Sequence, residues 1–284
     1  MKKIKHVVKD TQKHWVGDGF HVRSIFGYNN LGQTISPFLL MDYAEPMNFQ
    51  PAEKIRGVGE HPHRGFETVT IVYDGEVEHR DSHGGGGKIS KGDVQWMTAG
   101  SGLVHEEFHS KEFSRTGGLF EMIQLWVNLP AKDKMTKPRY QGITHAQIPA
   151  VETKNGVIRV IAGDYAGAKG PAQTFTPINM WDVRLKQNTQ TQFQTPSGDT
   201  TLVFVLSGEI EIDAQTFSHA NLIVLENHGT DFEIRTSKDS KILILSGKPL
   251  NEPVVGYGPF VMNNPEEIKQ AFIDFDNGKM GQLV

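Results

Sequence analysis

Cysteine is absent from the sequence. This absence excludes disulfide bonds, thiolate nucleophiles and zinc sites built on thiolates, so a bound metal has to use nitrogen and oxygen ligands. A chain without cysteine also suits a reducing compartment. We therefore expect a cytoplasmic protein.

Long apolar runs and clusters of basic residues are also missing. No stretch of about 18 apolar residues occurs, and the basic segment 1–17 has no apolar run behind it. The sequence therefore predicts neither a membrane span nor a secretory signal. Lys and Arg are scattered and the net charge is −4, a balance that disfavours direct binding to nucleic-acid phosphates.

The composition, with 37% hydrophobic and 22% charged residues, is typical of a globular protein. Its 284 residues favour two lobes of about 100–150 residues each. Short apolar segments rich in Val, Ile, Phe and Trp recur and end in Gly, Asp or Asn, which predicts an all-β protein. Examples are SPFLLMDY (36–43), ETVTIVYDG (67–75), GDVQWMTAG (92–100), EMIQLWVNL (121–129), TLVFVLSG (201–208) and KILILSG (241–247). A single short helix is expected after Asn264, because Pro265 suits a first helical position.

A gap-free internal repeat indicates a duplication. TVTIVYDGEVE (68–78) aligns with TLVFVLSGEIE (201–211), and each copy reads as strand, tight turn, strand. The same hairpin occurring twice predicts the same small barrel twice. The polar, proline-containing stretch 130–149 is the most linker-like part of the middle. We therefore expect lobes at 1–140 and 141–284.

Six of the twelve histidines lie between positions 61 and 109, which suggests a metal site in the first lobe. Alternate side chains of a strand share a face, so His61 and His63 can converge on one ion. His105 and Glu107 repeat this spacing, about 7 Å apart along a strand. By the same alternation Glu106 faces away. A lone His-x-His pair often lies on an exposed edge strand and binds nothing. The second pair favours a metal site, because the two pairs together supply a complete set of four N and O ligands.

Other candidates fit the spacing less well. Glu67 has the right alternation but lies about 13 Å beyond His63 on an extended strand, unless Gly65 bends the chain; we assign it a supporting place around the ligands. We do not expect His79, His83 or His109 to bind the ion, because they follow a turn, adjoin a glycine run or flank the site.

The second lobe keeps the hairpin without the ligands. The repeat aligns Gln194 and Pro196 with His61 and His63, so no second metal is expected there, and His228 and Glu233 do not make a site by themselves. The run GGGGK (84–88) resembles a phosphate loop but lacks the following Ser or Thr. We interpret it as a flexible turn.

The segments HPHRGFETVTIVYDGEVEHRDS (61–82) and KGDVQWMTAGSGLVHEE (91–107) resemble the pirin family of the cupin superfamily. SPFLLMDY before them and EPVVGYGPFVMN (252–263) after them extend the resemblance over nearly the whole chain. The resemblance implies a bicupin, two tandem cupin-type (jelly-roll) β-barrel lobes. It also implies three His and one Glu as metal ligands, which fall on His61, His63, His105 and Glu107. The chain departs from the general cupin pattern, in which a Glu of the first motif is a ligand.

Three imidazoles and one carboxylate leave positions open on an octahedral ion, which suits a redox-capable metal. We expect one divalent transition metal ion, Fe(II) first, with Cu, Ni, Mn or Zn as alternatives. The resemblance implies a quercetin 2,3-dioxygenase activity, in which a flavonol reacts with O2, its ring opens and carbon monoxide leaves. Glu107 would be both a ligand and the catalytic base. Candidate pocket residues, each of which could equally be ordinary core, are Phe38, Met41, Phe49, Phe66, Trp96 and Trp126.

An alternative function is regulatory. In that case the lobe uses the oxidation state of its metal as a switch and modulates a protein partner without physiological catalysis, as some members of the family do. A purely structural metal is the third and least favoured reading.

Overall fold

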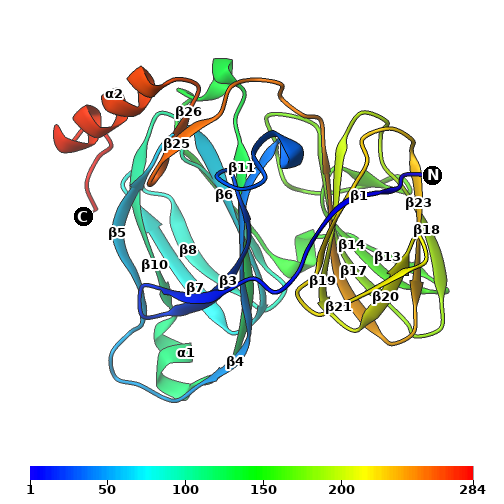
Figure 1. Cartoon of the computed structure of the whole chain (residues 1–284). Helices are drawn as coiled ribbons and strands as arrows, with labels where there is room; N and C mark the ends of the chain where they lie inside the picture. The colour runs from blue at the N-terminus through cyan, green and yellow to red at the C-terminus, as the bar shows by residue number, and fades with distance from the viewer. Residues whose placement is uncertain (284) are drawn as a thin grey trace. The chain divides into compact units, whose positions relative to one another are not determined.

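The computed structural model describes residues 1–283, and almost all of its regular structure is β-strand (Figure 1). Contacts divide the chain into two compact units. We call residues 12–32, 38–145 and 251–284 the first lobe, and residues 1–11, 33–37 and 146–250 the second lobe. No helix among the described residues is long and apolar enough to cross a membrane.

The first lobe contains a seven-stranded sheet, ordered β12-β9-β6-β11-β4-β3-β2, and a four-stranded sheet, ordered β5-β10-β7-β8. Its elements are β2 (Lys13–Val16), β3 (Phe20–Gly27), β4 (Phe38–Phe49), β5 (Gly57–His63), β6 (Phe66–Asp74), β7 (Glu76–Asp81), β8 (Gly86–Ser90), β9 (Val94–Thr98), β10 (Leu103–His109), α1 (Lys111–Thr116), β11 (Gly118–Asn128), β12 (Arg139–Ile143), β25 (Val255–Tyr257), β26 (Phe260–Met262) and α2 (Pro265–Asp276).

The second lobe repeats this plan, with seven strands ordered β1-β22-β19-β24-β17-β14-β13 and four ordered β18-β23-β20-β21. Its strands are β1 (Ile4–Val8), β13 (Ala150–Thr153), β14 (Gly156–Ala162), β15 (Asp164–Tyr165), β16 (Ala168–Lys169), β17 (Ile178–Leu185), β18 (Gln190–Gln194), β19 (Thr200–Ser207), β20 (Glu209–Ile212), β21 (Gln215–Ser218), β22 (Leu222–Leu225), β23 (Asp231–Thr236) and β24 (Ser240–Gly247). Short 3-10 turns cover Gly32–Ile35, Ala131–Asp133 and His145–Gln147.

The internal repeat corresponds to equivalent hairpins. β6 turns into β7 at Gly75, and β19 turns into β20 at Gly208. The two glycines have φ angles of 86° and 88°, a left-handed conformation that disfavours any side chain. The matching sheets and hairpins confirm the prediction of two tandem cupin-type lobes.

The two interiors differ in polarity. The second lobe is filled by a continuous apolar cluster that includes Trp181, Phe193 and Phe232. In the first lobe an apolar cluster occupies one end, around Phe49 and Phe120, whereas the space between its sheets also holds buried histidine, glutamine and glutamate side chains. Buried polar groups cost free energy unless they are partnered. The buried polar groups therefore indicate that a functional site lies in the interior of the first lobe.

The division of the chain differs from a simple cut at residue 140. The transition from first to second lobe lies at 145/146, but residues 1–11 belong to the second lobe and 251–284 to the first. β1 pairs with β22, and β26 lies beside Arg64, where the Val261 N–H donates to the Arg64 carbonyl at 3.1 Å. The stretch 130–149 is not an open linker either, because β12 pairs with β9 in the first-lobe sheet.

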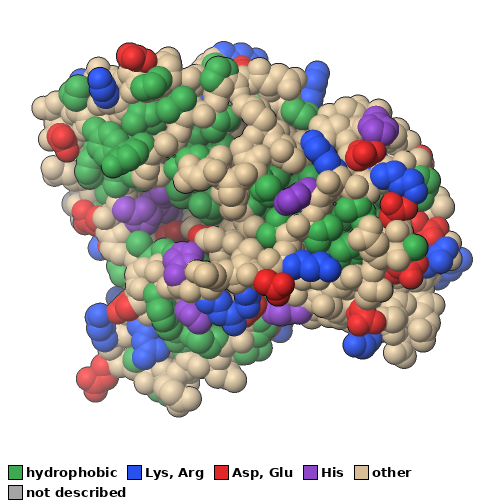
Figure 2. All heavy atoms as spheres, viewed as in Figure 1, with side chains coloured by type: hydrophobic (Ala, Val, Ile, Leu, Met, Phe, Trp, Pro, Cys, Tyr) green, Lys and Arg blue, Asp and Glu red, His purple; other side chains and the backbone are tan. Residues whose placement is uncertain are grey.

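Helix α2 forms where the sequence predicts it. Asn264 is its N-cap and accepts a hydrogen bond from the Glu267 N–H at 2.9 Å, while Pro265 takes the first helical position. Apolar side chains gather over the region of this helix and β25 (Figure 2). Tyr257 of β25 and Ile273 and Phe275 of α2 are exposed. A second, six-residue helix, α1, was not expected; Ser110 caps it by accepting from the Phe113 N–H.

Lys134 is a buried lysine that ties three segments of the first lobe together. Its Nζ donates to the Gly65 carbonyl at 2.8 Å, the Val261 carbonyl at 2.9 Å and the Asn128 Oδ1 at 2.7 Å. Its side chain therefore joins the loop after β5, β26 and the end of β11.

We predict that Lys134→Met destabilises the protein by about 2–4 kcal/mol, because three buried acceptors lose their donor. The midpoint of urea denaturation measures this loss. Lys132→Met is the matched control, since Lys132 is exposed and its removal should change the free energy of unfolding by less than about 0.5 kcal/mol. Equal midpoints for the two variants would contradict the assigned role.

Candidate metal centre

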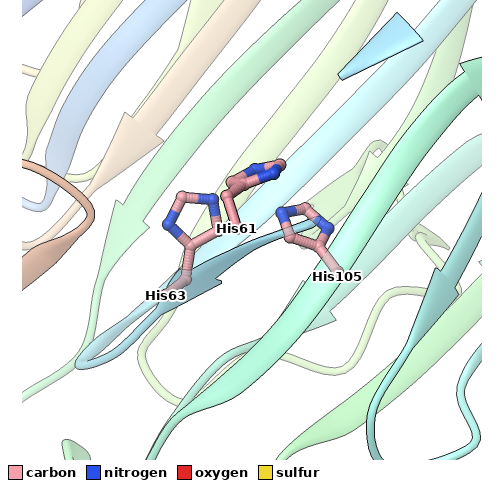
Figure 3. A group of neighbouring side chains, drawn as sticks. All are labelled: His61, His63 and His105. Carbon is pink, nitrogen blue, oxygen red and sulfur yellow. The ribbon is translucent and has the colours of Figure 1, made fainter. Parts of the chain in front are cut away.

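Three imidazoles meet where β5 and β10 pair. In this antiparallel register His61 lies opposite His105, and His63 lies opposite Leu103. The ring centroids are 4.2 Å apart for His61 and His105, and 4.9 Å apart for each of the other two pairs. The close-up shows the rings turned toward one another from the two strands (Figure 3). One nitrogen from each of the three lies within 4.8 Å of the others.

Two of these rings are oriented by backbone carbonyls. The Nδ1 of His61 lies 2.8 Å from the Gly59 carbonyl, and the Nδ1 of His63 lies 3.2 Å from the Pro259 carbonyl. A carbonyl oxygen only accepts, so Nδ1 carries the proton in both rings. The Nε2 lone pairs are then left for an ion, as is usual for metal-binding histidines.

His105 supplies the most direct observation in favour of a metal. Its side chain is fully buried, and its Nε2 has no hydrogen-bond partner. Buried polar atoms in proteins rarely lack a partner. Burial, together with the neighbouring histidines, also holds the pKa of His63 and of His105 well below the usual value. Both rings are therefore neutral, which is the form that binds metals.

Glu107 lies beside this cluster with its carboxylate held from two sides. Gln124 Nε2 donates to Oε2 at 2.9 Å and Gln95 Nε2 donates to Oε1 at 3.1 Å. Ligand atoms of Glu107, His105 and His79 form a second group within 4.8 Å. Among residues 1–283 there are thus two possible metal-binding groups, which share His105. One contains His61 and His63, and the other contains His79 and Glu107. Their donor set fits a divalent transition metal.

The carboxylates on either side of the site follow strand alternation. Glu106 points away and forms an ion pair with Arg80. On β6, Thr70 faces Glu107, so Glu67 lies on the opposite face, where Thr98 Oγ1 donates to its Oε1 at 2.8 Å. The expectation that Glu67 supports the ligands was therefore wrong, because Glu67 lies three positions before Thr70 and an odd offset puts two strand side chains on opposite faces.

His79 was not expected to take part in the site, but it is buried against His105. Its ring centroid lies 5.0 Å from that of His105, and its ring stacks on Tyr140 at 5.1 Å. The sequence carried a signal that was overlooked, because His79 and Asp81 are also two residues apart on one strand. Gln95, Gln124 and Tyr140 carried no such signal. His83 is exposed, and His109 packs among aromatic rings such as Phe49 and Phe120.

Aromatic side chains line one side of the cluster. Phe66 and Trp126 stack on each other at 4.2 Å, and their centroids lie 5.1 and 5.2 Å from that of His63. The other four predicted pocket residues do not stack on the histidine cluster. Phe49 packs on His109, Trp96 lies opposite Val69 of β6, and Phe38 and Met41 are fully buried.

No comparable cluster occurs among the described residues of the second lobe. Gln194 donates to Asp231 at the position equivalent to His61. The exposed His228 Nε2 lies 2.8 Å from a Glu226 carboxylate oxygen, and Glu233 bonds to Gln190 and Arg235.

Two barrels of one plan, with a His and Glu cluster inside the first, define a bicupin. Family models match both lobes: Pirin over residues 19–127 and the Pirin C-terminal cupin domain over residues 180–281. The chain belongs to the pirin family.

Relatives match along nearly the full length. A Pseudomonas aeruginosa protein, named provisionally as a quercetin 2,3-dioxygenase, is 54% identical over 281 residues, which cover 98% of each chain. Human pirin is 37% identical over 93% of this chain and 89% of its own. A crystal structure described as quercetin 2,3-dioxygenase from Acinetobacter baumannii has 52% identity, a TM-score of 0.97 and full coverage of both chains.

A pH-dependent stability follows from Glu67, whose pKa is raised to about 7 by burial. In the unfolded chain the carboxyl has its ordinary pKa of 4.5, so the native state holds more protons between the two values and stability falls as pH rises through this window. We predict that wild type loses up to roughly 3 kcal/mol there, a loss absent from Glu67→Gln. Urea denaturation at pH 4.5 and pH 8 tests this, and identical pH dependence in both proteins would contradict it.

Proposed function

We propose that this protein is a metal-dependent dioxygenase that cleaves flavonols such as quercetin with O2 and releases carbon monoxide. The observation that carries the proposal is the buried, unpartnered Nε2 of His105 beside the rings of His61 and His63. The names of the Pseudomonas and Acinetobacter relatives support the same activity.

We assign the metal ligands as His61, His63, His105 and Glu107, holding one divalent transition metal ion. Fe(II) is the first choice, because three imidazoles and one carboxylate leave positions open for substrate and O2. Cu, Ni, Mn and Zn are alternatives with the same ligand types. When bound, the metal supplies Lewis acidity and a redox-active centre for the reaction of the flavonol with O2.

Glu107 is the residue we assign to proton transfer. Its carboxylate accepts the proton of the flavonol 3-hydroxyl, which makes the substrate electron-rich toward O2. Gln95 and Gln124 each donate to one of its oxygens, so the carboxylate is fixed in orientation without being neutralised. A fixed orientation at the reacting hydroxyl is what general-base catalysis requires.

Substrate entry is proposed on the side of His61, the one partly exposed imidazole of the three. Histidine side chains reach the surface over the region of β5 (Figure 2). The flat rings of a flavonol suit the stacked pair Phe66 and Trp126 beside His63, since aromatic faces favour stacked or edge contacts.

The decisive experiment is anaerobic metal analysis of freshly purified protein, followed by oxygen uptake and carbon monoxide release with quercetin. Near one redox-active metal per chain with metal-dependent turnover supports the dioxygenase. A filled site without turnover on any flavonol refutes it and supports the regulatory, redox-sensing function, a role open to relatives named only as pirin.

Paired substitutions on β10 separate the two neighbouring carboxylates. Glu107→Gln should lower the turnover number at least about 100-fold, because a base and a charged ligand are lost together. Glu106→Gln should leave turnover within a few-fold, since Glu106 pairs with Arg80 on the other face. Stopped-flow loss of the flavonol absorbance measures both. The reverse order of effects would show that the ligand assignment on β10 is wrong.

A further inference from the structure

His105 lacks the backbone carbonyl that orients each of its two neighbours. Its Nδ1 instead faces the Nδ1 of His79 at 3.3 Å. Two imidazole nitrogens at this distance form a hydrogen bond only if one carries the proton and the other a lone pair. Which nitrogen carries it decides whether the Nε2 of His105 is free to bind an ion.

The hydrogen bonds around Gln95 fix the direction. Glu107 is a carboxylate that only accepts, so the amide nitrogen of Gln95 faces it, at 3.1 Å. The Gln95 amide oxygen correspondingly accepts from the Tyr140 hydroxyl at 3.2 Å. The same amide nitrogen lies 3.3 Å from the Nδ1 of His79. His79 Nδ1 is therefore the acceptor, and its single lone pair is shared between the Gln95 amide and the Nδ1–H of His105, both at 3.3 Å. This makes His105 Nδ1 the donor.

Asp81 completes the arrangement from the other side of His79. Its Oδ2 lies 3.5 Å from the His79 Nε2, a long contact in which the imidazole donates. Its Oδ1 accepts the backbone N–H groups of His83 at 2.8 Å and Gly85 at 3.0 Å. Both nitrogens of His79 are thus occupied by protein neighbours, which leaves neither for an ion.

The glycine run after β7 has a place in this network. A Cβ at Gly85 would lie 2.3 Å from the Asp81 Oδ2 and 2.7 Å from Tyr140 Cβ. A side chain there would displace the oxygen that faces His79. The run GGGGK is therefore not just a flexible turn, since Gly85 makes room for the carboxylate.

We infer that Asp81 and His79 are positioning residues that hold His105 in the tautomer with its proton on Nδ1 and its Nε2 lone pair toward the metal. The inference rests on the proposed metal site. Carboxylates behind a metal-binding histidine raise its basicity and fix its ring, and losing such partners costs about 10–100-fold in metal affinity. Here the carboxylate acts through a second imidazole, so the support of His105 can be removed by substitution, unlike the carbonyls behind His61 and His63.

The test measures Fe(II) affinity by anaerobic chelator competition, independently of turnover. Asp81→Asn and His79→Ala should weaken Fe(II) binding about 10–100-fold. His79→Asn should restore most of the affinity, because its amide oxygen overlays the Nδ1 acceptor. The matched control is His83→Ala, an exposed histidine on the same turn, and it should leave the affinity unchanged.

A second measurement reads the tautomer directly. Long-range proton–nitrogen-15 NMR of the metal-free protein, with His105 signals identified by His105→Asn, should show the His105 proton on Nδ1 in wild type. In Asp81→Asn and His79→Ala it should shift toward Nε2. An unchanged tautomer, with or without weaker binding, overturns the inference and leaves His79 a packing residue.

X-ray absorption of the Fe(II)-loaded proteins separates positioning from ligation. Three imidazoles should be counted in wild type and in His79→Asn alike; a drop to two in His79→Asn would make His79 a ligand and overturn the inference. Failure of the proposed function is distinct, because a wild type that binds Fe(II) without consuming O2 on quercetin refutes the dioxygenase and leaves the affinity and tautomer tests intact.

Discussion

The pairing of β5 with β10 is the constraint on which the candidate metal centre depends. Because His61 lies opposite His105, a slip of one residue would turn the whole set of inward side chains to the other face. The loop after β5 is correspondingly well anchored. Arg64 forms a buried ion pair with Asp274 at 2.9 Å and donates to the Ser101 carbonyl at 2.7 Å. Register and anchoring together bring the imidazoles to one point.

The polar interior of the first lobe does not prevent stable folding, because its buried groups form a hydrogen-bond network in which donors face acceptors. Tyr140, Gln95, Glu107 and His79 each have a partner with the complementary role. The Nε2 of His105 is left without a partner, as is the Nε1 of Trp126 beside His63. The second lobe solves the same packing problem with an apolar cluster and no such network, which explains why one barrel plan gives one candidate site.

Much of this could be predicted from the sequence because it depends on local alternation. The tandem hairpins, the helix after Asn264 and the opposite facing of Glu106 and Glu107 follow from spacing alone. The ligand set itself stays a prediction. The burial of His79 and the contribution of Gln95 could not be foreseen, because they depend on which strands become neighbours. The sequence also did not predict that residues 1–11 belong to the second lobe and 251–284 to the first. Pairing such as that of β1 with β22 joins residues more than 200 positions apart.

The location of residues 251–284 in the first lobe has a consequence for biosynthesis. This segment supplies the Pro259 carbonyl behind His63 and the Asp274 partner of Arg64. A ribosome delivers the chain from its N-terminus, so the first lobe, which begins at residue 12, is completed only after residues 146–250 of the second lobe have been made. In a nascent chain the candidate ligands therefore lack these partners until the second lobe has been made. Assembly of the candidate metal centre is thereby tied to completion of translation, and prematurely ended chains lack part of its support.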